Sequence, residues 1–145
     1  MTFSRRYRYR FGDIDDAGIA YYPRFFHYFH CAFEDWWKDH LGLDYAVMMH
    51  EGDLGFPAVH VESDFRAPIQ YGDEPLIHVG VVRIGGSSVD FGFWMTLPGA
   101  DPEVRSWAKI TTVAVSMEKR TKREIPEEVR AKLEAELLGE FPPSV

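Results

Sequence analysis

The longest regular pattern of apolar positions in this chain lies between residues 23 and 37. At about 100° per residue the apolar side chains cover one broad arc of a helix, while Arg24, Glu34 and Lys38 fall on the opposite stripe. Pro23 marks the start, because proline is favoured in the first helical turn. The pattern predicts a largely buried helix, with these residues on its apolar arc: Phe25, Phe26, Phe29, Ala32, Phe33, Trp36 and Trp37.

Residues 3–11 alternate aromatic and basic side chains, which is the period of a strand with one solvent-facing side. Tyr7, Tyr9 and Phe11 fall on one side of that strand. Basic residues interleaved with aromatics also suit a platform for nucleic acid. The run is short and the chain is acidic overall, so we expect an ordinary strand.

The remaining apolar runs predict more strands than helices. Short breaks at 85–88 and 98–102 indicate that the last strands form an antiparallel meander. A short helix is expected after the capping residue Asp44, and the tail from Phe141 is expected to fray. The chain therefore predicts one α+β domain over 1–145. Its expected elements after the long helix are a helix at 45–50, strands at 58–66, 75–84, 88–97 and 104–117, and a helix at 127–138.

Composition narrows the class of protein. The 145 residues are 46% hydrophobic and 15% aromatic, which is typical of a globular chain with a sizeable core. A net charge of −7 argues against general nucleic-acid binding, which depends on neutralising phosphates. Cys31 is the single cysteine, so no internal disulfide is possible. No stretch has membrane-spanning length, and we expect a cytoplasmic protein that binds no membrane.

An acidic turn directly before the long helix is the strongest chemical feature. Asp13, Asp15 and Asp16 lie within four positions, and Gly18 allows a left-handed backbone after them. An aspartate before a helix is most often a cap or turn residue. A cap needs only Asp13 or Asp16, which leaves Asp15 unexplained. A carboxylate beside free N–H groups at a helix start can form an oxyanion site with its own base or nucleophile.

The other sequence motifs give weaker evidence of a functional site. Gly85-Gly86-Ser87-Ser88 is either a plain hairpin turn or a small nest of N–H groups for an anion. The six histidines have no spacing that predicts a metal site, and no Gly-x-Ser-x-Gly nucleophile elbow is present.

The segment FGDIDDAGIAYYPRFFHYF at 11–29 resembles the N-terminal signature of hotdog-fold acyl-CoA thioesterases, in particular the 4-hydroxybenzoyl-CoA thioesterase type. The shared pattern is Asp13-x-Asp15-x-x-Gly18 followed by Tyr22, and the similarity continues at 65–73 and 85–93. The resemblance implies a hotdog fold, in which a curved antiparallel sheet wraps around one long central helix, here with an added C-terminal helix. It also implies a homo-oligomer, a dimer or tetramer, with active sites at the subunit interface.

The same resemblance implies roles for particular residues. Asp15 attacks the thioester carbonyl or activates water, and the Tyr22 backbone N–H polarises the carbonyl, with Gly18 supplying the bend between them. No cofactor is implied, because coenzyme A is part of the substrate. Where the aryl-CoA enzyme carries an Arg-Arg-Lys cluster for the CoA phosphates and a helix carboxylate for the substrate phenol, this chain has other residues. The expected substrate-binding residues are Phe29, His30, Arg83, Gly85, Gly86, Ser87 and Ser88.

Three alternatives stay open at this point. A hotdog hydratase or dehydratase would pair a histidine with a helix carboxylate such as Glu34 or Asp35. A noncatalytic acyl-CoA binder would need no catalytic acid. Another group of thioesterases uses a helix glutamate, here Glu34, in place of Asp15.

Overall fold

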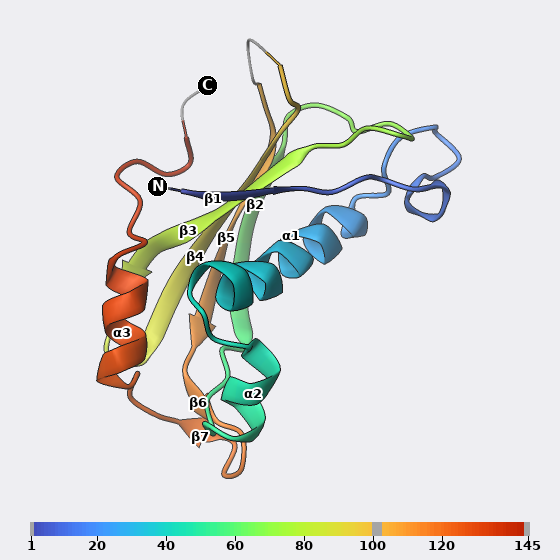
Figure 1. Ribbon diagram of the computed structural model, residues 1–145. Coiled ribbons are helices and arrows are strands. Elements are labelled where there is room, and N and C mark those ends of the chain that lie inside the picture. Colours follow the sequence, from blue (N-terminus) through green and yellow to red (C-terminus); the bar gives the residue numbers. More distant parts are fainter. Residues whose placement is uncertain (1, 100–102, 144–145) are drawn as a thin grey trace.

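The computed structural model describes residues 2–99 and 103–143 (Figure 1). Five strands form one antiparallel sheet in the order β1-β3-β4-β5-β2, and α1 crosses one face of this curved sheet. The strands of the sheet are β1 (Phe3–Arg6), β2 (Ala58–Phe65), β3 (Leu76–Ile84), β4 (Ser88–Thr96) and β5 (Val104–Val113).

Helix α1 (Pro23–Asp35) confirms the predicted central helix. It continues as one π-helical segment, η2 (Trp36–His40), and the chain then turns at Gly42 with a φ of 75°. Its apolar arc packs against the inner face of the sheet, where alternate residues of β3 and β4 point toward the helix. The centre of this core is aromatic and almost fully buried, and comprises Phe29, Phe33, Trp36, Trp37, Phe91 and Phe93.

The sheet confirms the predicted meander, because β3, β4 and β5 are hydrogen-bonded neighbours in chain order. Strand β2 pairs only with β5 among the described residues, with Phe65 opposite Ser106 and Val61 opposite Ile110. It therefore forms an edge of the sheet, and nearly all of its side chains are exposed.

The N-terminal strand is shorter than predicted. Strand β1 ends at Arg6, and the backbone N–H groups of Tyr7 and Tyr9 then bond irregularly to the carbonyls of Pro75 and Asp73. Tyr9 is buried as expected, but the prediction for Phe11 was wrong, since its side chain is 84% exposed. The chain turns away from the sheet there, in the short 3-10 helix η1 (Phe11–Asp13).

The predicted strand 104–117 is divided at Ala114. The chain leaves the main sheet where β5 ends at Val113, and β6 (Val115–Ser116) pairs instead with β7 (Thr121–Lys122) in a small hairpin. The predicted short helix is present as α2 (Tyr45–His50), and the Asp44 carboxylate caps it by accepting the Val47 N–H at 3.2 Å.

The C-terminal helix α3 (Glu127–Glu134) is also shorter than predicted. The chain after it adds to the edge of β3, where Val81 donates to the Glu136 carbonyl and accepts from the Leu138 N–H. The expectation of a frayed tail was wrong for Phe141, whose ring packs 6.1 Å from Trp94 and 5.7 Å from Trp107. The 100–102 part of the predicted turn and the last two residues lie outside the described residues.

Across the described part of the chain, no helix is both long and apolar enough to cross a membrane.

Candidate active site

The acidic turn folds as a compact loop between η1 and α1. The Asp15 N–H donates to the Ile19 carbonyl at 3.0 Å, and the Gly18 N–H donates to the Asp15 carbonyl at 3.0 Å. Gly18 has a φ of 81°, which confirms the left-handed turn expected there. Two further backbone hydrogen bonds hold the loop in place. The Ala20 N–H donates to the Ile69 carbonyl at 2.7 Å, and the Tyr21 N–H donates to the Asp13 carbonyl at 2.8 Å.

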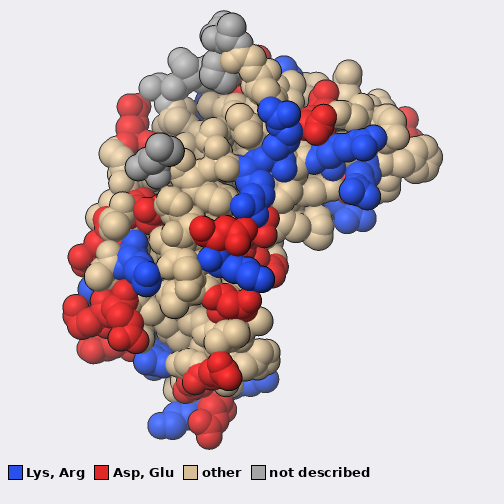
Figure 2. All heavy atoms as spheres, viewed as in Figure 1, with Lys and Arg blue, Asp and Glu red and all other residues tan. Residues whose placement is uncertain are grey.

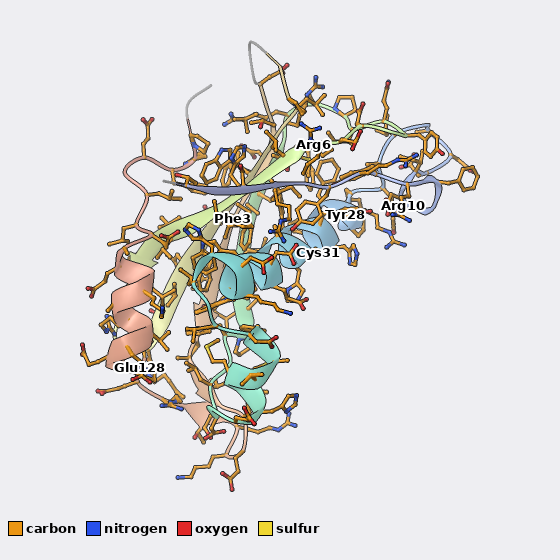
Figure 3. All side chains as sticks on the ribbon, in the orientation of Figure 1. Phe3, Arg6, Arg10, Tyr28, Cys31 and Glu128 are labelled. Carbon is orange, nitrogen blue, oxygen red and sulfur yellow. The ribbon has the colours of Figure 1, made fainter. Side chains whose placement is uncertain are left out.

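Asp13 is the anchor of this loop. Its side chain is buried and accepts hydrogen bonds from the Arg10 backbone N–H and the Tyr28 hydroxyl, each at 2.7 Å. The Arg24 guanidinium lies 3.6 Å from its second oxygen. Tyr28 lies on α1 and faces the N-terminal segment, where its hydroxyl also approaches the Arg8 carbonyl (Figure 3). Asp13 is therefore a turn and anchoring residue, as the sequence indicated.

Asp15 has a different environment from Asp13. Its side chain is exposed, and one oxygen accepts the Ala17 N–H at 2.8 Å. The other oxygen has no partner among the described residues. The carboxylate is thus oriented by its own turn and keeps one oxygen available for chemistry.

The start of α1 lies directly after this loop. Tyr22 is the N-cap of the helix, and its carbonyl accepts the Phe25 N–H at 3.1 Å. Its own backbone N–H has no acceptor within the described part of the chain. Such an N–H at a helix start carries the positive end of the helix dipole, which favours negative charge nearby.

A first hollow of about 340 Å³ lies between the start of α1 and the end of β2, and we call it the helix-start hollow. Arg66 lines its rim, and this exposed side chain forms no hydrogen bond or ion pair with a described residue. Nothing in the sequence motifs marked Arg66, because only the fold brings it beside Tyr22. The other lining residues are Ile19, Ala20, Phe25, Phe65, Ala67 and Pro68.

A second hollow of about 240 Å³ lies between α1 and the sheet, and we call it the aromatic hollow. His30 stands at its exposed rim, where its Nε2 lies 2.9 Å from a Glu34 carboxylate oxygen. Phe29 is fully buried against Phe93 and does not line this hollow, so it belongs to the core. The lining residues besides His30 are Phe26, Phe33, Tyr45, Phe56, Pro57, Ala58, Phe91, Phe93, Ile110 and Thr112.

The turn at 85–88 is a tight hairpin whose backbone carbonyl groups all accept hydrogen bonds from the protein. Arg130 of α3 donates to the carbonyls of Gly85 and Gly86 at 2.8 and 3.1 Å. The N–H groups of Gly86 and Ser87 have no acceptor among the described residues, so both are available to donate to an anion. Sequence patterns did not reveal Arg130, because α3 reaches this turn only in the folded chain.

The basic residues near that turn are partly committed to the protein itself. Arg83 lies 3.3 Å from Asp90 and also donates to the Ser88 hydroxyl at 3.3 Å. Arg123 donates to the carbonyls of Gly52 and Asp53, so it fastens two loops together. In the view of Figure 2, basic side chains gather over the N-terminal segment and acidic ones over α3.

Within one chain the expected catalytic residues and the expected binding residues at 83–88 form two separate groups. Asp15, Gly18 and Tyr22 come together at one end of α1, whereas the 85–88 turn and Arg83 lie at the far end of the sheet (Figure 1). The exposed edge of β2 runs between these ends, from Ala58 at the aromatic hollow to Phe65 at the helix-start hollow.

Comparisons with known proteins identify the family of this chain. The sequence profile of a family described as the thioesterase-like superfamily matches residues 9–133. A 1,4-dihydroxy-2-naphthoyl-CoA hydrolase of Synechococcus sp. (strain WH7803) is 30% identical over 138 residues, which cover 90% of this chain and 87% of the relative.

Solved structures give the same fold. A 1,4-dihydroxy-2-naphthoyl-CoA thioesterase from Synechocystis superposes with a TM-score of 0.80 at 22% identity, covering 92% of this chain and 96% of its own. A gentisyl-coenzyme A thioesterase superposes with a TM-score of 0.78 at 24% identity, and the match covers 88% of this chain and 99% of the thioesterase chain. The chain therefore belongs to the thioesterase-like superfamily, as an acyl-CoA thioester hydrolase with the hotdog fold.

Proposed function

We propose that this protein hydrolyses an aromatic acyl-CoA thioester to the free carboxylate and CoA, with Asp15 as nucleophile or general base. The observation that carries the proposal is the exposed Asp15 carboxylate, which is oriented by the Ala17 N–H and keeps one oxygen free. It lies in the loop that leads to the start of α1, where the Tyr22 N–H has no acceptor among the described residues. Gly18 gives the left-handed bend that returns the chain from Asp15 toward the helix.

The chemistry follows from these positions. Asp15 adds to the thioester carbonyl, or removes a proton from the water that adds to it. The carbonyl oxygen then gains negative charge, which the Tyr22 N–H stabilises. Losing one such donor typically costs roughly 3–4 kcal/mol of transition-state stabilisation. The C–S bond breaks as CoA thiolate leaves, and the thiolate takes up a proton; where an acyl-aspartate has formed, water hydrolyses it and returns Asp15.

The aromatic hollow supports an aromatic acyl group of one or two rings. Five of its eleven lining residues are phenylalanine, and aromatic rings bury large surfaces with specific edge and face contacts. The His30–Glu34 pair at its rim supplies a polar contact for a ring hydroxyl. The names of the relatives, which act on dihydroxynaphthoyl and gentisyl esters, support the same class of substrate.

We further propose that the working enzyme is a homo-oligomer paired through β2. Antiparallel pairing of two copies about a two-fold axis places Phe65 of each strand near Ala58 of the other. The helix-start hollow of one subunit then faces the aromatic hollow of its partner. Tetramers arise when two such dimers associate. The free thiol of Cys31 is consistent with a reducing, cytoplasmic compartment.

In the same paired arrangement, two regions with basic side chains, one from each subunit, lie near the site and are available to bind the CoA phosphates. Arg66 lies on the rim of the helix-start hollow, close to the proposed reaction centre. The 85–88 turn and Arg83 of the second subunit approach the same end of the site, although each chain holds them far from its own Asp15. Free N–H groups at Gly86 and Ser87, with the hydroxyls of Ser87 and Ser88, suit phosphate oxygens.

The test is thiol release from benzoyl-, hydroxybenzoyl-, phenylacetyl- and aliphatic CoA esters. Asp15→Asn removes the nucleophile or base without touching the core, so kcat is expected to fall at least about a hundredfold while the thermal melt is unchanged. Asp16→Asn is the matched control, because this exposed neighbour carries the same charge. Full activity in folded Asp15→Asn, together with its loss in Glu34→Gln, would move the catalytic role to the helix glutamate.

The His30–Glu34 pair also fits the hydratase alternative, since it joins a histidine to a helix carboxylate at 2.9 Å. Addition of water to an enoyl-CoA without thiol release, lost in His30→Gln, would favour that reaction. Binding of CoA esters with neither reaction would favour a noncatalytic binder.

A further inference from the structure

The aromatic hollow is closed on one side by a wall that it shares with another hollow. This neighbour, the methionine hollow, has a volume of about 330 Å³ and lies between α2, the segment before β2 and the β6–β7 hairpin. Tyr45, Phe56 and Pro57 line both hollows, so they stand between them. The methionine hollow is otherwise lined by Met49, Gly55, Val115, Ser116, Met117 and Arg120.

Tyr45 is held firmly in this wall. Its hydroxyl oxygen accepts the Phe56 backbone N–H at 3.0 Å. Its ring lies 5.2 Å from that of Phe33 and 6.1 Å from that of Trp37. Phe56 in turn stacks on Trp37, with ring centroids 5.6 Å apart. Burial raises the pKa of the Tyr45 hydroxyl, so the phenol stays neutral and keeps its place among aromatic neighbours.

The orientation of the aromatic hollow follows from the burial of its lining. Phe91 and Phe93 are almost fully buried and form its floor, whereas His30 and Ala58 are exposed and mark its mouth. Between an acyl group in this hollow and the methionine hollow stand the three shared residues Tyr45, Phe56 and Pro57, of which Tyr45 and Phe56 contribute aromatic rings.

The space behind the wall suits a longer apolar group. Met49 and Met117 line it, and methionine side chains adapt readily to irregular apolar shapes. Gly55 leaves room for Met117, because a β-carbon there would lie 2.6 Å from the Met117 sulfur.

We propose that Tyr45 sets the upper size limit of the acyl group, by separating the aromatic hollow from the methionine hollow. This inference rests on the proposed function. Removal of the ring joins the two hollows into one apolar channel, which accepts acyl chains that the wild-type wall excludes.

The experiment compares kcat/KM for lauroyl-CoA and benzoyl-CoA in wild type, Tyr45→Ala and Tyr45→Leu. The lauroyl-to-benzoyl ratio is expected to rise at least about tenfold in both variants, because several methylene groups gain apolar contacts. Tyr45→Phe keeps the ring and loses only the hydroxyl, so its ratio should stay near the wild-type value. Met49→Ala is the matched control, since it enlarges the methionine hollow and leaves the wall intact; its ratio should not change.

The outcomes separate this inference from the proposed function. A wild type that releases thiol from none of the esters would refute the proposed function itself. A wild type active on benzoyl-CoA, with an unchanged ratio in a folded Tyr45 variant, would refute only the role of Tyr45. Phe56→Leu tests the same wall if both Tyr45 variants fail to fold, with the same rise in ratio expected. A rise in Met49→Ala equal to that in Tyr45→Ala would show that the wall is not the barrier.

Discussion

The acidic loop assigns different tasks to aspartates only two residues apart. Asp13 is buried and accepts hydrogen bonds from the Arg10 N–H and the Tyr28 hydroxyl, and the Arg24 guanidinium lies 3.6 Å from its second oxygen. Its charge therefore holds the loop in place. Asp15 is exposed and makes one local contact, so its charge remains available. The spacing of these carboxylates therefore separates an anchoring residue from the residue proposed to react, and the Tyr28 hydroxyl connects the anchoring residue to α1.

Replacing Tyr28 by phenylalanine tests this anchoring. The variant loses the hydroxyl that donates to Asp13, and we expect the free energy of unfolding to fall by about 1–3 kcal/mol, because a buried carboxylate is left with one donor fewer. Thiol release should fall with it, since the loop that orients Asp15 loosens. Chemical denaturation and the thioesterase assay measure both effects. Wild-type stability and activity in the variant would show that the Arg10 and Arg24 contacts suffice.

The pH dependence of the same contact has a definite sign. Burial and the hydrogen bond to Asp13 raise the pKa of Tyr28 to about 12 in the folded protein, above its ordinary value near 10. The folded state holds this proton more tightly than the unfolded state. The stability contributed by Tyr28 is therefore complete below pH about 10 and lost as the pH rises through about 12. Wild type should lose more stability than Tyr28→Phe over that interval.

At this scale the sequence singled out Asp15, the residue proposed to react, and missed the residues that support its loop. Three aspartates before a helix left Asp15 without a structural task, and the family resemblance gave it a role. Tyr28, Arg66 and Arg130 could not be found in this way, because their partners lie far away in the sequence or on other elements. Phe29 was misassigned for a related reason: helical spacing places it on the apolar arc, but only packing shows which part of that arc faces a hollow.

At the scale of elements, the C-terminal segment acts as a strap on the sheet. After α3 it adds a hydrogen-bonded bridge at Val81 and then crosses the face of the sheet opposite α1. Two glycines receive it: a β-carbon at Gly80 would lie 2.6 Å from Leu138, and one at Gly92 would lie 2.8 Å from the ring of Phe141. Small residues at these positions allow the strap to lie close to the strands.

Gly92→Ala is expected to displace the ring of Phe141. Overpacking of this kind typically costs about 1–3 kcal/mol, so the melting temperature should fall. Gly86→Ala is the control, because a β-carbon at Gly86 meets no atom within 4 Å. Fluorescence of Trp94 and Trp107, which contact Phe141, reports the displacement directly. A variant as stable as wild type, with unchanged fluorescence, would mean that the strap contributes little.

At the scale of the whole molecule, the main feature is the exposed edge of β2, which has no partner strand on its outer side among the described residues. Val59, Val61 and Phe65 are 61%, 44% and 47% exposed on this strand. A long edge strand with exposed apolar side chains is a template for pairing with another chain. The pairing of two copies proposed above covers this edge and places the helix-start hollow of one subunit opposite the aromatic hollow of the other.

Val61→Lys tests this assembly, because a residue near the middle of β2 meets its own copy across a two-fold axis. Like charges placed opposite each other on paired strands repel, so the variant should be monomeric by light scattering and lose thiol release. Val47→Lys is the control, since Val47 is similarly exposed on α2. A monomeric wild type with full activity would exclude a shared site.

The sequence by itself determined the central helix, the meander and the acidic turn, because each depends on local periodicity or on turn residues. The length of α3 and the break at Ala114 depended on tertiary structure, since partners distant in the sequence, at Val81 and at Gly55, take over the backbone hydrogen bonds there. The same holds for the site. Asp15, Gly18 and Tyr22 are close in the chain, so the sequence alone was enough to group them as a candidate site. The hollows and the wall at Tyr45 are formed by residues of α1, α2 and the sheet, which come together only in the folded chain. Local sequence patterns therefore do not predict them.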